Sequence, residues 1–337
     1  MRSKSSQIIQ YFLLLSIGLY LCWLFFRGLN FTELKQVIST GNFSWFYLVM
    51  LVSLMVYIIR VLRWQMLIKA TGHESNFFNA LSALSIGYFV SFIVPRLGEI
   101  TRCLSVKKHS RIPFMELLGT VIIERIVDLI SLIIVLLLTL ILQFNQVIEF
   151  FRENIFRPIY TGFIVNGNSK LFVIVMITIA ISSVAFFYFR RYILERSPLL
   201  ILQFIRSFKN GLISIAKLRH KKLFILYTFL IWVCYFLMTY FWFFVFKETS
   251  VLGWGACLTI LSIGTIGRSV PIQGGGMGAY HFLVEKVVLL YGIGGLFGKT
   301  LATLIHAGQT FFTFAMGLVG LIIFFVNYWR NKSSNHS

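Results

Sequence analysis

The stretch VPRLGEITR, from Val94 to Arg102, carries three ionisable residues directly after an apolar run. Arg96, Glu99 and Arg102 follow Pro95 within seven residues, and the preceding run begins near residue 77. In an apolar chain such a string lies at or inside a bilayer, where ionisable groups are costly and usually functional. The stretch is therefore a candidate polar site at the end of a membrane-buried segment.

A second charged group lies in the apolar run 115–142, which contains Glu124, Arg125 and Asp128. Glu124 comes ten residues into this run, which is about 15 Å deep at the helical rise of 1.5 Å per residue. Asp128 lies one turn further on the same face, because residues i and i+4 stack on a helix. Arg125 is three residues from Asp128 and can neutralise it. Groups at this depth face a bundle interior or a wet cavity rather than lipid.

These two charged groups allow two interpretations. They could form an internal ion-pair network that locks helices together. Buried ion pairs seldom repay their desolvation as stability, however, and this favours a functional role. Because the planar guanidinium binds two phosphate oxygens at once, Arg96, Arg102 and Arg125 suit an anionic lipid headgroup. In that case Glu99, Glu124 and Asp128 would position the arginines or contact a cationic headgroup.

A third stretch, RSVPIQGGGMGAYHFLVEK, runs from Arg268 to Lys286 and joins the candidate headgroup site. Its glycines leave backbone N–H groups free at the start of a predicted helix, where an anion is favoured. They are Gly274, Gly275, Gly276 and Gly278. The glycine run could equally be a flexible joint without a ligand. His281 and Glu285 share a helix face, but one such pair supplies two metal ligands at most, so neither a metal site nor another cofactor is predicted.

The composition indicates a polytopic membrane protein. Of 337 residues 58% are hydrophobic and only 12% are charged, against about a quarter in soluble domains, and the mean hydropathy is +0.84. The formal net charge is +20. Its basic residues lie between apolar spans, which points to the cytoplasmic membrane face and anionic lipids rather than to nucleic acid.

Six segments are long enough to cross a bilayer, which takes roughly 20 apolar residues. They are residues 8–26, 44–68, 115–142, 170–189, 222–246 and 299–326. Two shorter runs, 77–94 and 252–270, are rich in Gly and Ser and end at a proline. Basic residues in short loops, such as Arg63 and Lys69, are expected on the cytoplasmic side. All the basic loops can lie on that side only if the two short runs are re-entrant and do not cross the membrane. The prediction is an all-α protein of the cytoplasmic membrane, with six full spans, two re-entrant segments and both termini cytoplasmic.

The two short runs share the sequence Leu-Ser-Ile-Gly, at Leu84–Gly87 and Leu261–Gly264. Each is preceded by two spans and followed by one long span, so each unit has three full crossings. An odd number of crossings makes the repeat an inverted one, and in transporters such repeats build a site where broken helices meet. We expect one membrane domain over 1–337, with repeats at about 8–142 and 170–326. Close helix packing by small residues is the alternative reason for the glycines.

Three motifs in this order resemble the transmembrane region of lysylphosphatidylglycerol synthases. They are Pro-x-x-Gly-Glu-x-x-Arg at residues 95–102, Glu-Arg-Ile-x-Asp at 124–128, and the Pro-x-x-Gly-Gly-x-Gly type from Pro271. The resemblance runs over roughly residues 8–326. It implies an all-helical membrane domain of the kind that moves an aminoacylated phospholipid between leaflets, with stand-alone flippase-like inner-membrane relatives.

Two departures from that family limit what the resemblance implies. The soluble aminoacyl-transferase domain of the fused synthases is not among these residues, so lipid lysylation is not expected. Where the family's glycine motif commonly has an acid three residues after its last glycine, this chain has His281. A cationic headgroup is therefore not implied.

The sequence favours a lipid translocase, with membrane phospholipids, above all anionic ones, as partners. The first alternative is an intramembrane enzyme that uses Glu124 or Asp128 as general acid or base, although the resemblance favours a transporter over an enzyme. The second alternative is a non-catalytic subunit of a lipid or envelope biosynthesis complex. Its partner would be a separate biosynthetic enzyme, and a second copy of the chain is a further candidate partner.

Overall fold

The computed structural model describes residues 31–157 except Arg96 and Arg111, Thr161, residues 218–334 except Pro271, and a few positions between 16 and 27. The predicted spans 8–26 and 170–189 lie outside these residues, apart from isolated positions in the first. In the described part every regular element is a helix, which confirms the predicted all-α class. The helices are α2 (Phe31–Ser39), α3 (Ser44–Ala70), α4 (Phe77–Ile93), α5 (Leu97–His109), α6 (Phe114–Leu142), α7 (Phe144–Phe151), the π-helix η1 (Arg152–Phe156), α11 (Lys221–Phe243), α12 (Trp254–Ser269), α13 (Gln273–Gly276), α14 (Ala279–Leu290) and α15 (Gly295–Ser334).

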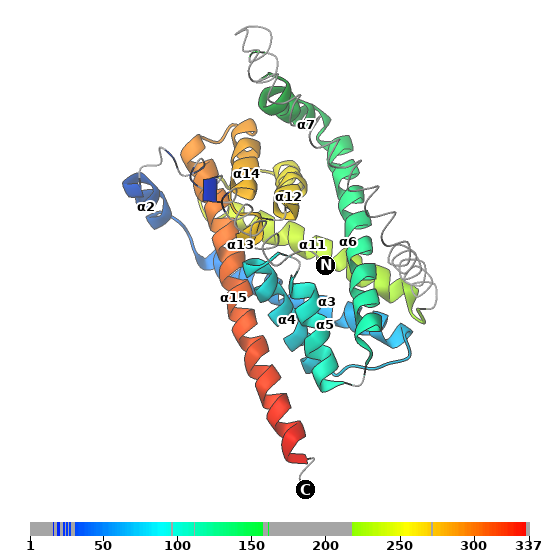
Figure 1. The fold of residues 1–337 in the computed structure, drawn as a ribbon. Coiled ribbons are helices and arrows are strands. Elements are labelled where there is room, and N and C mark those ends of the chain that lie inside the picture. Colours follow the sequence, from blue (N-terminus) through cyan, green and yellow to red (C-terminus); the bar gives the residue numbers. More distant parts are fainter. Residues whose placement is uncertain are drawn as a thin grey trace.

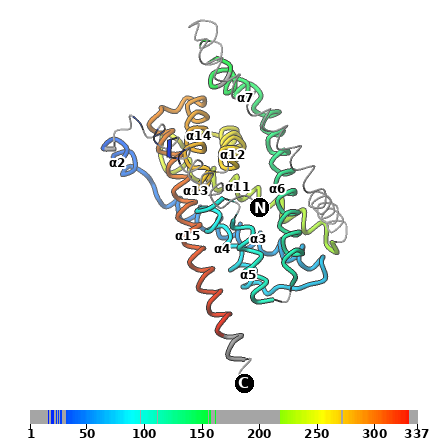
Figure 2. The backbone as a smooth tube through the Cα atoms, viewed as in Figure 1, coloured from blue at the N-terminus to red at the C-terminus, as the bar shows by residue number. Residues whose placement is uncertain are grey.

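Four of these helices are long and apolar enough to cross a membrane, namely α3, α6, α11 and α15. They confirm four predicted spans, with ends within a few residues for α3, α6 and α11 and a longer α15. The long α6 and α15 flank the body in Figure 1, and Figure 2 follows the same path as a tube. Length and apolar composition were enough to predict these helices because a bilayer imposes both.

Between the long helices lie two pairs of shorter ones, α4 with α5 and α12 with α14. The side chain of Asn76 caps α4 by accepting a hydrogen bond from the Phe78 N–H at 2.9 Å. The helix ends at Ile93 because Val94 precedes a proline and takes an extended conformation, with φ −127° and ψ 105°. Val270, also before a proline, is extended in the same way after α12. The first helix of each pair, α4 or α12, covers one of the two short runs that were predicted to be re-entrant, and each pair forms a helix hairpin (Figure 1).

Glycines hold the two arms of each hairpin together. Gly87 of α4 lies against Gly98 of α5, and a Cβ atom added to Gly98 would overlap the Gly87 carbonyl oxygen. In the second hairpin a Cβ atom added to Gly267 would lie 3.0 Å from the Tyr280 Cα atom, and one added to Gly264 would lie 2.9 Å from the Tyr280 ring. The shared Leu-Ser-Ile-Gly sequence therefore ends, in both places, at the contact between hairpin arms.

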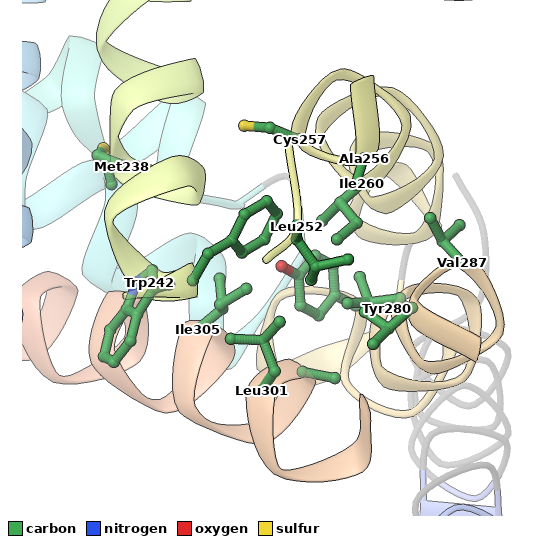
Figure 3. Close-up of a cluster of buried hydrophobic side chains, with 14 of the residues drawn as sticks. Met238, Trp242, Leu252, Ala256, Cys257, Ile260, Tyr280, Val287, Leu301 and Ile305 are labelled. Carbon is green, nitrogen blue, oxygen red and sulfur yellow. The ribbon is translucent and has the colours of Figure 1, made fainter. Parts of the chain in front are cut away.

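Two hydrophobic cores hold the helices around these hairpins. One packs α11, α12, α14 and α15 together with the first half of α3. Figure 3 shows part of it, with Trp242 of α11, Ile260 of α12, Tyr280 of α14 and Ile305 of α15 converging. The other packs α3, α4, α5 and α6 together with Phe224 and Met316. Each core is thus built mainly by one of the two predicted repeats and completed by residues of the other.

The contacts between helices also occur in corresponding pairs. α3 contacts α11, α4 contacts α15, and α12 contacts α6. We match α3, α4, α5 and α6 in order with α11, α12, α14 and α15. The α4–α15 contact then corresponds to the α12–α6 contact, and the α3–α11 contact corresponds to itself. An inverted repeat produces such a pattern, and on this basis we propose that the chain contains one.

Candidate functional site

The carboxylate of Glu124 on α6 lies at the centre of a buried cluster of charges. Its side chain has no exposed surface, and it lies 2.9 Å from Arg102 of α5 and 3.1 Å from Arg60 of α3. Arg63 and Arg125 follow at 3.7 and 3.8 Å. A carboxylate this deeply buried is tolerated only when opposite charges and hydrogen bonds surround it.

Asp128, one turn along α6, is held by the same two arginines of α3. Its carboxylate oxygens lie 2.7 Å from Arg63 and 3.1 Å from Arg60. Arg125, which could neutralise Asp128 by its spacing, forms no ion pair with it within 4.0 Å in the described part of the chain. Among the ion pairs of the described residues Arg125 contacts Glu99 and Glu124 instead. The reason is that α3 brings two guanidinium groups directly onto Asp128 from a neighbouring helix.

Arg102 is fixed between α3 and α6. Its guanidinium donates to both oxygens of Glu124, at 3.2 and 2.9 Å, and it stacks 3.6 Å from the centre of the Trp64 ring. Trp64 is itself held by a hydrogen bond from Nε1 to the Thr120 hydroxyl, 2.9 Å long. Arg102 is only 2% exposed, so it acts as a buried partner of Glu124 and has no surface for a ligand.

Arg125 is different because its side chain is 40% exposed. Its Nε lies 3.1 Å from Glu99 of α5, which is 39% exposed. A half-exposed ion pair is weak, of the order of 0–1 kcal/mol. The Arg125 guanidinium can therefore exchange Glu99 for another anion at little cost.

A cavity of about 640 Å³ opens beside this cluster, between the two helix hairpins. Arg60, Arg125 and Asp128 line one wall, and Arg268 of α12 lines the other. A smaller cavity of about 270 Å³ adjoins it and shares Arg60 and Arg268 with it. The aromatic lining residues are Tyr88, Phe92, Trp232, Tyr235 and Tyr280. A volume of this size is that of ligand pockets, typically about 300–1,000 Å³, with apolar walls and a few polar groups.

Of the residues predicted from the sequence, four line this cavity: Arg125, Asp128, Arg268 and Gly275. Glu99, Arg102 and Glu124 do not line it: Glu99 pairs with Arg125, Glu124 pairs with Arg60, and Arg102 pairs with Glu124. Arg96 lies outside the described residues. The remaining predicted residues do not line either cavity; they are Gly274, Gly276, Gly278, His281 and Glu285.

The glycine run forms an ordered joint between α12 and α14. Gly274, Gly275, Gly276 and Gly278 all have positive φ, between 64° and 86°, a conformation that glycine adopts without a steric cost. A Cβ atom on Gly276 would lie 2.5 Å from the Gly267 carbonyl oxygen, so the joint presses against α12. The glycines were predicted either to bind an anion or to form a joint without a ligand. This geometry favours the joint, in which Gly275 also lines the cavity.

His281 caps the helix that follows this joint. Its Nδ1 accepts a hydrogen bond from the Gly278 N–H at 3.2 Å. A glutamate at this third helical position could accept the same bond. His306 of α15 lies next to His281, with ring centres 4.6 Å apart, and its Nε2 lies 3.0 Å from the Gly274 carbonyl oxygen.

Glu285, one turn after His281, lies 4.0 Å from the Lys299 ammonium. Together these residues brace α14 against α15. Within the described part of the chain no three His, Cys, Asp or Glu side chains gather as metal ligands.

The sequence interpretation did not include Arg60 or Arg63 among the candidate site residues. Both are buried inside α3, and Arg63 has no exposed surface. The signal that could have found them is their spacing, since residues three apart share a helix face inside an otherwise apolar span. Arg60 also donates hydrogen bonds from Nε and Nη2 to the hydroxyl of Tyr235 on α11, at 2.9 and 2.7 Å.

Comparison with known proteins places these features in a family. No solved structure matches the chain. A UPF0104 membrane protein of Methanocaldococcus jannaschii is 28% identical over 124 residues, which covers 36% of this chain and 34% of that relative. The match thus spans about a third of the relative's length. Residues 9–317 match the family described as the lysylphosphatidylglycerol synthase TM region. Because this match covers most of the chain, the protein belongs to the lysylphosphatidylglycerol synthase transmembrane-region family.

Proposed function

We propose that this protein moves a phospholipid with a polar headgroup, or a lipid-linked intermediate, between the leaflets of the cytoplasmic membrane. The observation that carries the proposal is the cavity of about 640 Å³ between the two hairpins, with Arg125 on one wall and Arg268 on the other. The headgroup would occupy this cavity while the acyl chains stay in the apolar surroundings. Both termini would face the cytoplasm, where basic loops meet anionic lipids.

The charged wall supports transport rather than acid–base chemistry. A general acid or base must approach the proton that it transfers to within hydrogen-bond distance. Glu124 is fully buried, and Asp128 is held by Arg60 and Arg63 at 3.1 and 2.7 Å. Both carboxylates thus already accept hydrogen bonds from guanidinium groups, and their role in this proposal is to hold those arginines in position.

Leaflet exchange of a fluorescent phospholipid in proteoliposomes tests the proposal. We expect Arg125→Ala to lower the exchange rate by about tenfold or more, because a hydrogen bond to a charged group contributes about 1.5–3 kcal/mol. Glu99→Gln should lower it less, by no more than about fivefold, because the ion pair that positions Arg125 contributes only about 0–1 kcal/mol. Both side chains are about 40% exposed, so both variants should remain folded.

Arg157→Ala is the matched control, since Arg157 forms an exposed ion pair with Glu153 at 2.6 Å, away from the cavity. It should exchange lipid at the wild-type rate. Wild-type exchange in Arg125→Ala and Glu99→Gln alike would reject the proposal and favour a non-catalytic partner role.

A further inference from the structure

We propose that the lipid bound in this cavity carries a phosphomonoester or diphosphate, a headgroup with two negative charges. This inference rests on the proposed function and names its substrate class. It comes from the balance of charge around the cavity and from the groups that remain available to a ligand.

Among the residues that the structure describes, the charge cluster holds one more positive than negative charge. It contains four guanidinium groups, those of Arg60, Arg63, Arg102 and Arg125, against three carboxylates, those of Glu99, Glu124 and Asp128. Arg268, on the opposite hairpin, adds a second excess charge. Its guanidinium lies 4.2 Å from the centre of the Tyr280 ring, and no carboxylate of the described residues lies within 4.0 Å of it.

The donors that face the cavity are not equally available. Arg60 uses Nη1 on Glu124 and Asp128, and Nε and Nη2 on the Tyr235 hydroxyl. Arg125 has only the half-exposed contact with Glu99 and a distant one with Glu124. A ligand would therefore be held by Arg125 on one side and Arg268 on the other.

Phosphate is suited to these two arginines. Its several oxygens accept charge-assisted hydrogen bonds from more than one guanidinium group at once.

Two excess charges favour a dianion over a monoanion. A phosphomonoester carries nearly two negative charges at pH 7, whereas a phosphodiester headgroup such as phosphatidylglycerol carries one. A monoanion would leave one of the two excess positive charges without a partner, and such a charge is costly in a site of low dielectric. Of the described residues that line the cavity, one is a carboxylate that the ammonium of a zwitterionic headgroup could meet, Asp128, and Arg60 and Arg63 already occupy its oxygens.

Isothermal titration calorimetry of the purified full-length protein in detergent tests this inference. The probes are dihexanoyl phosphatidic acid, dihexanoyl phosphatidylglycerol, dihexanoyl phosphatidylcholine and glycerol 3-phosphate. We expect phosphatidic acid to bind about tenfold more tightly than phosphatidylglycerol, in keeping with the strength of charge-assisted hydrogen bonds. Phosphatidylcholine should not bind. Glycerol 3-phosphate, which lacks acyl chains, should bind more weakly than phosphatidic acid.

Variants of Arg268 separate a binding role from a structural one. Arg268→Gln should reduce phosphatidic acid affinity to that of phosphatidylglycerol, while Arg268→Lys should retain part of the preference. Arg152→Gln is the control, because Arg152 is 63% exposed and pairs with Glu149 outside the cavity.

Equal affinities for the two anionic lipids, or a preference unchanged by Arg268→Gln, would overturn the inference. Glycerol 3-phosphate binding as tightly as phosphatidic acid would overturn the lipid assignment. Equal lipid affinities combined with lost exchange in Arg125→Ala would refute the substrate class and leave the proposed function standing.

Discussion

Glu124→Gln is expected to lower the free energy of unfolding by about 3–5 kcal/mol, the usual cost of breaking a buried ion pair from one side. Among the described residues, Glu124 is the only charge that contacts Arg60, Arg63, Arg102 and Arg125 together, at 2.9 to 3.8 Å, and the substitution removes it. Three of these arginines are nearly or fully buried. Arg102 would lose its carboxylate partner, and Arg60 and Arg63 would share Asp128 alone among the ion pairs of the described residues.

Denaturant titration of the purified protein in mixed micelles measures this effect. Glu116→Gln is the control on the same helix, because Glu116 is 42% exposed and pairs only with His73 within the described residues. It should cost no more than about 1 kcal/mol. Equal stability of the two variants would show that Glu124 does not hold the cluster together.

Gly98→Ala is the second substitution with a large expected effect. The new methyl group would overlap the Gly87 carbonyl oxygen, which belongs to the backbone and cannot rotate away. The α4–α5 hairpin would have to open, and we expect a loss of about 1–3 kcal/mol, as for other overpacked sites. Because α5 carries Arg102 and Glu99, the charged wall should be displaced as well.

Gly119→Ala serves as the comparison, since nothing lies within 4 Å of a Cβ atom placed there on α6. Alanine in an open helical position stabilises by about 0.5–1 kcal/mol relative to glycine. The two variants should therefore shift the denaturation midpoint in opposite directions. A neutral Gly98→Ala would mean that the hairpin arms are further apart than described.

The sequence predicted the extents of the long helices well, but it did not predict which helices pack against one another. Spans such as 44–68 and 115–142 follow from length and hydropathy, which the bilayer fixes for each helix separately. The proline before α5 marked a hairpin for the same local reason, because the residue before a proline leaves the helical region.

The charged site was only half predictable. Glu124 and Asp128 stood out because their own helix is otherwise apolar, but which arginines they bind depends on how α3 packs against α6. Spacing placed Arg125 within reach of Asp128, yet Arg63 lies 2.7 Å from that carboxylate. Sequence spacing shows which side chains on the same helix are within reach of one another. The packing of helices determines which of the possible partners forms the ion pair.

The glycines show the same division between local and tertiary information. Their positive φ angles in the joint 274–278 are typical of a glycine run. The contact of Gly98 with Gly87, eleven residues apart, could not be read from either residue alone.

The most direct measurement fills the cavity without changing any charge. Thr265 lines the cavity, so Thr265→Trp should block the route and lower phospholipid exchange in proteoliposomes by about tenfold or more. Ile130→Trp, at a position 50% exposed on α6, should exchange at the wild-type rate. Wild-type exchange by a folded Thr265→Trp variant would contradict a path through the cavity between the hairpins.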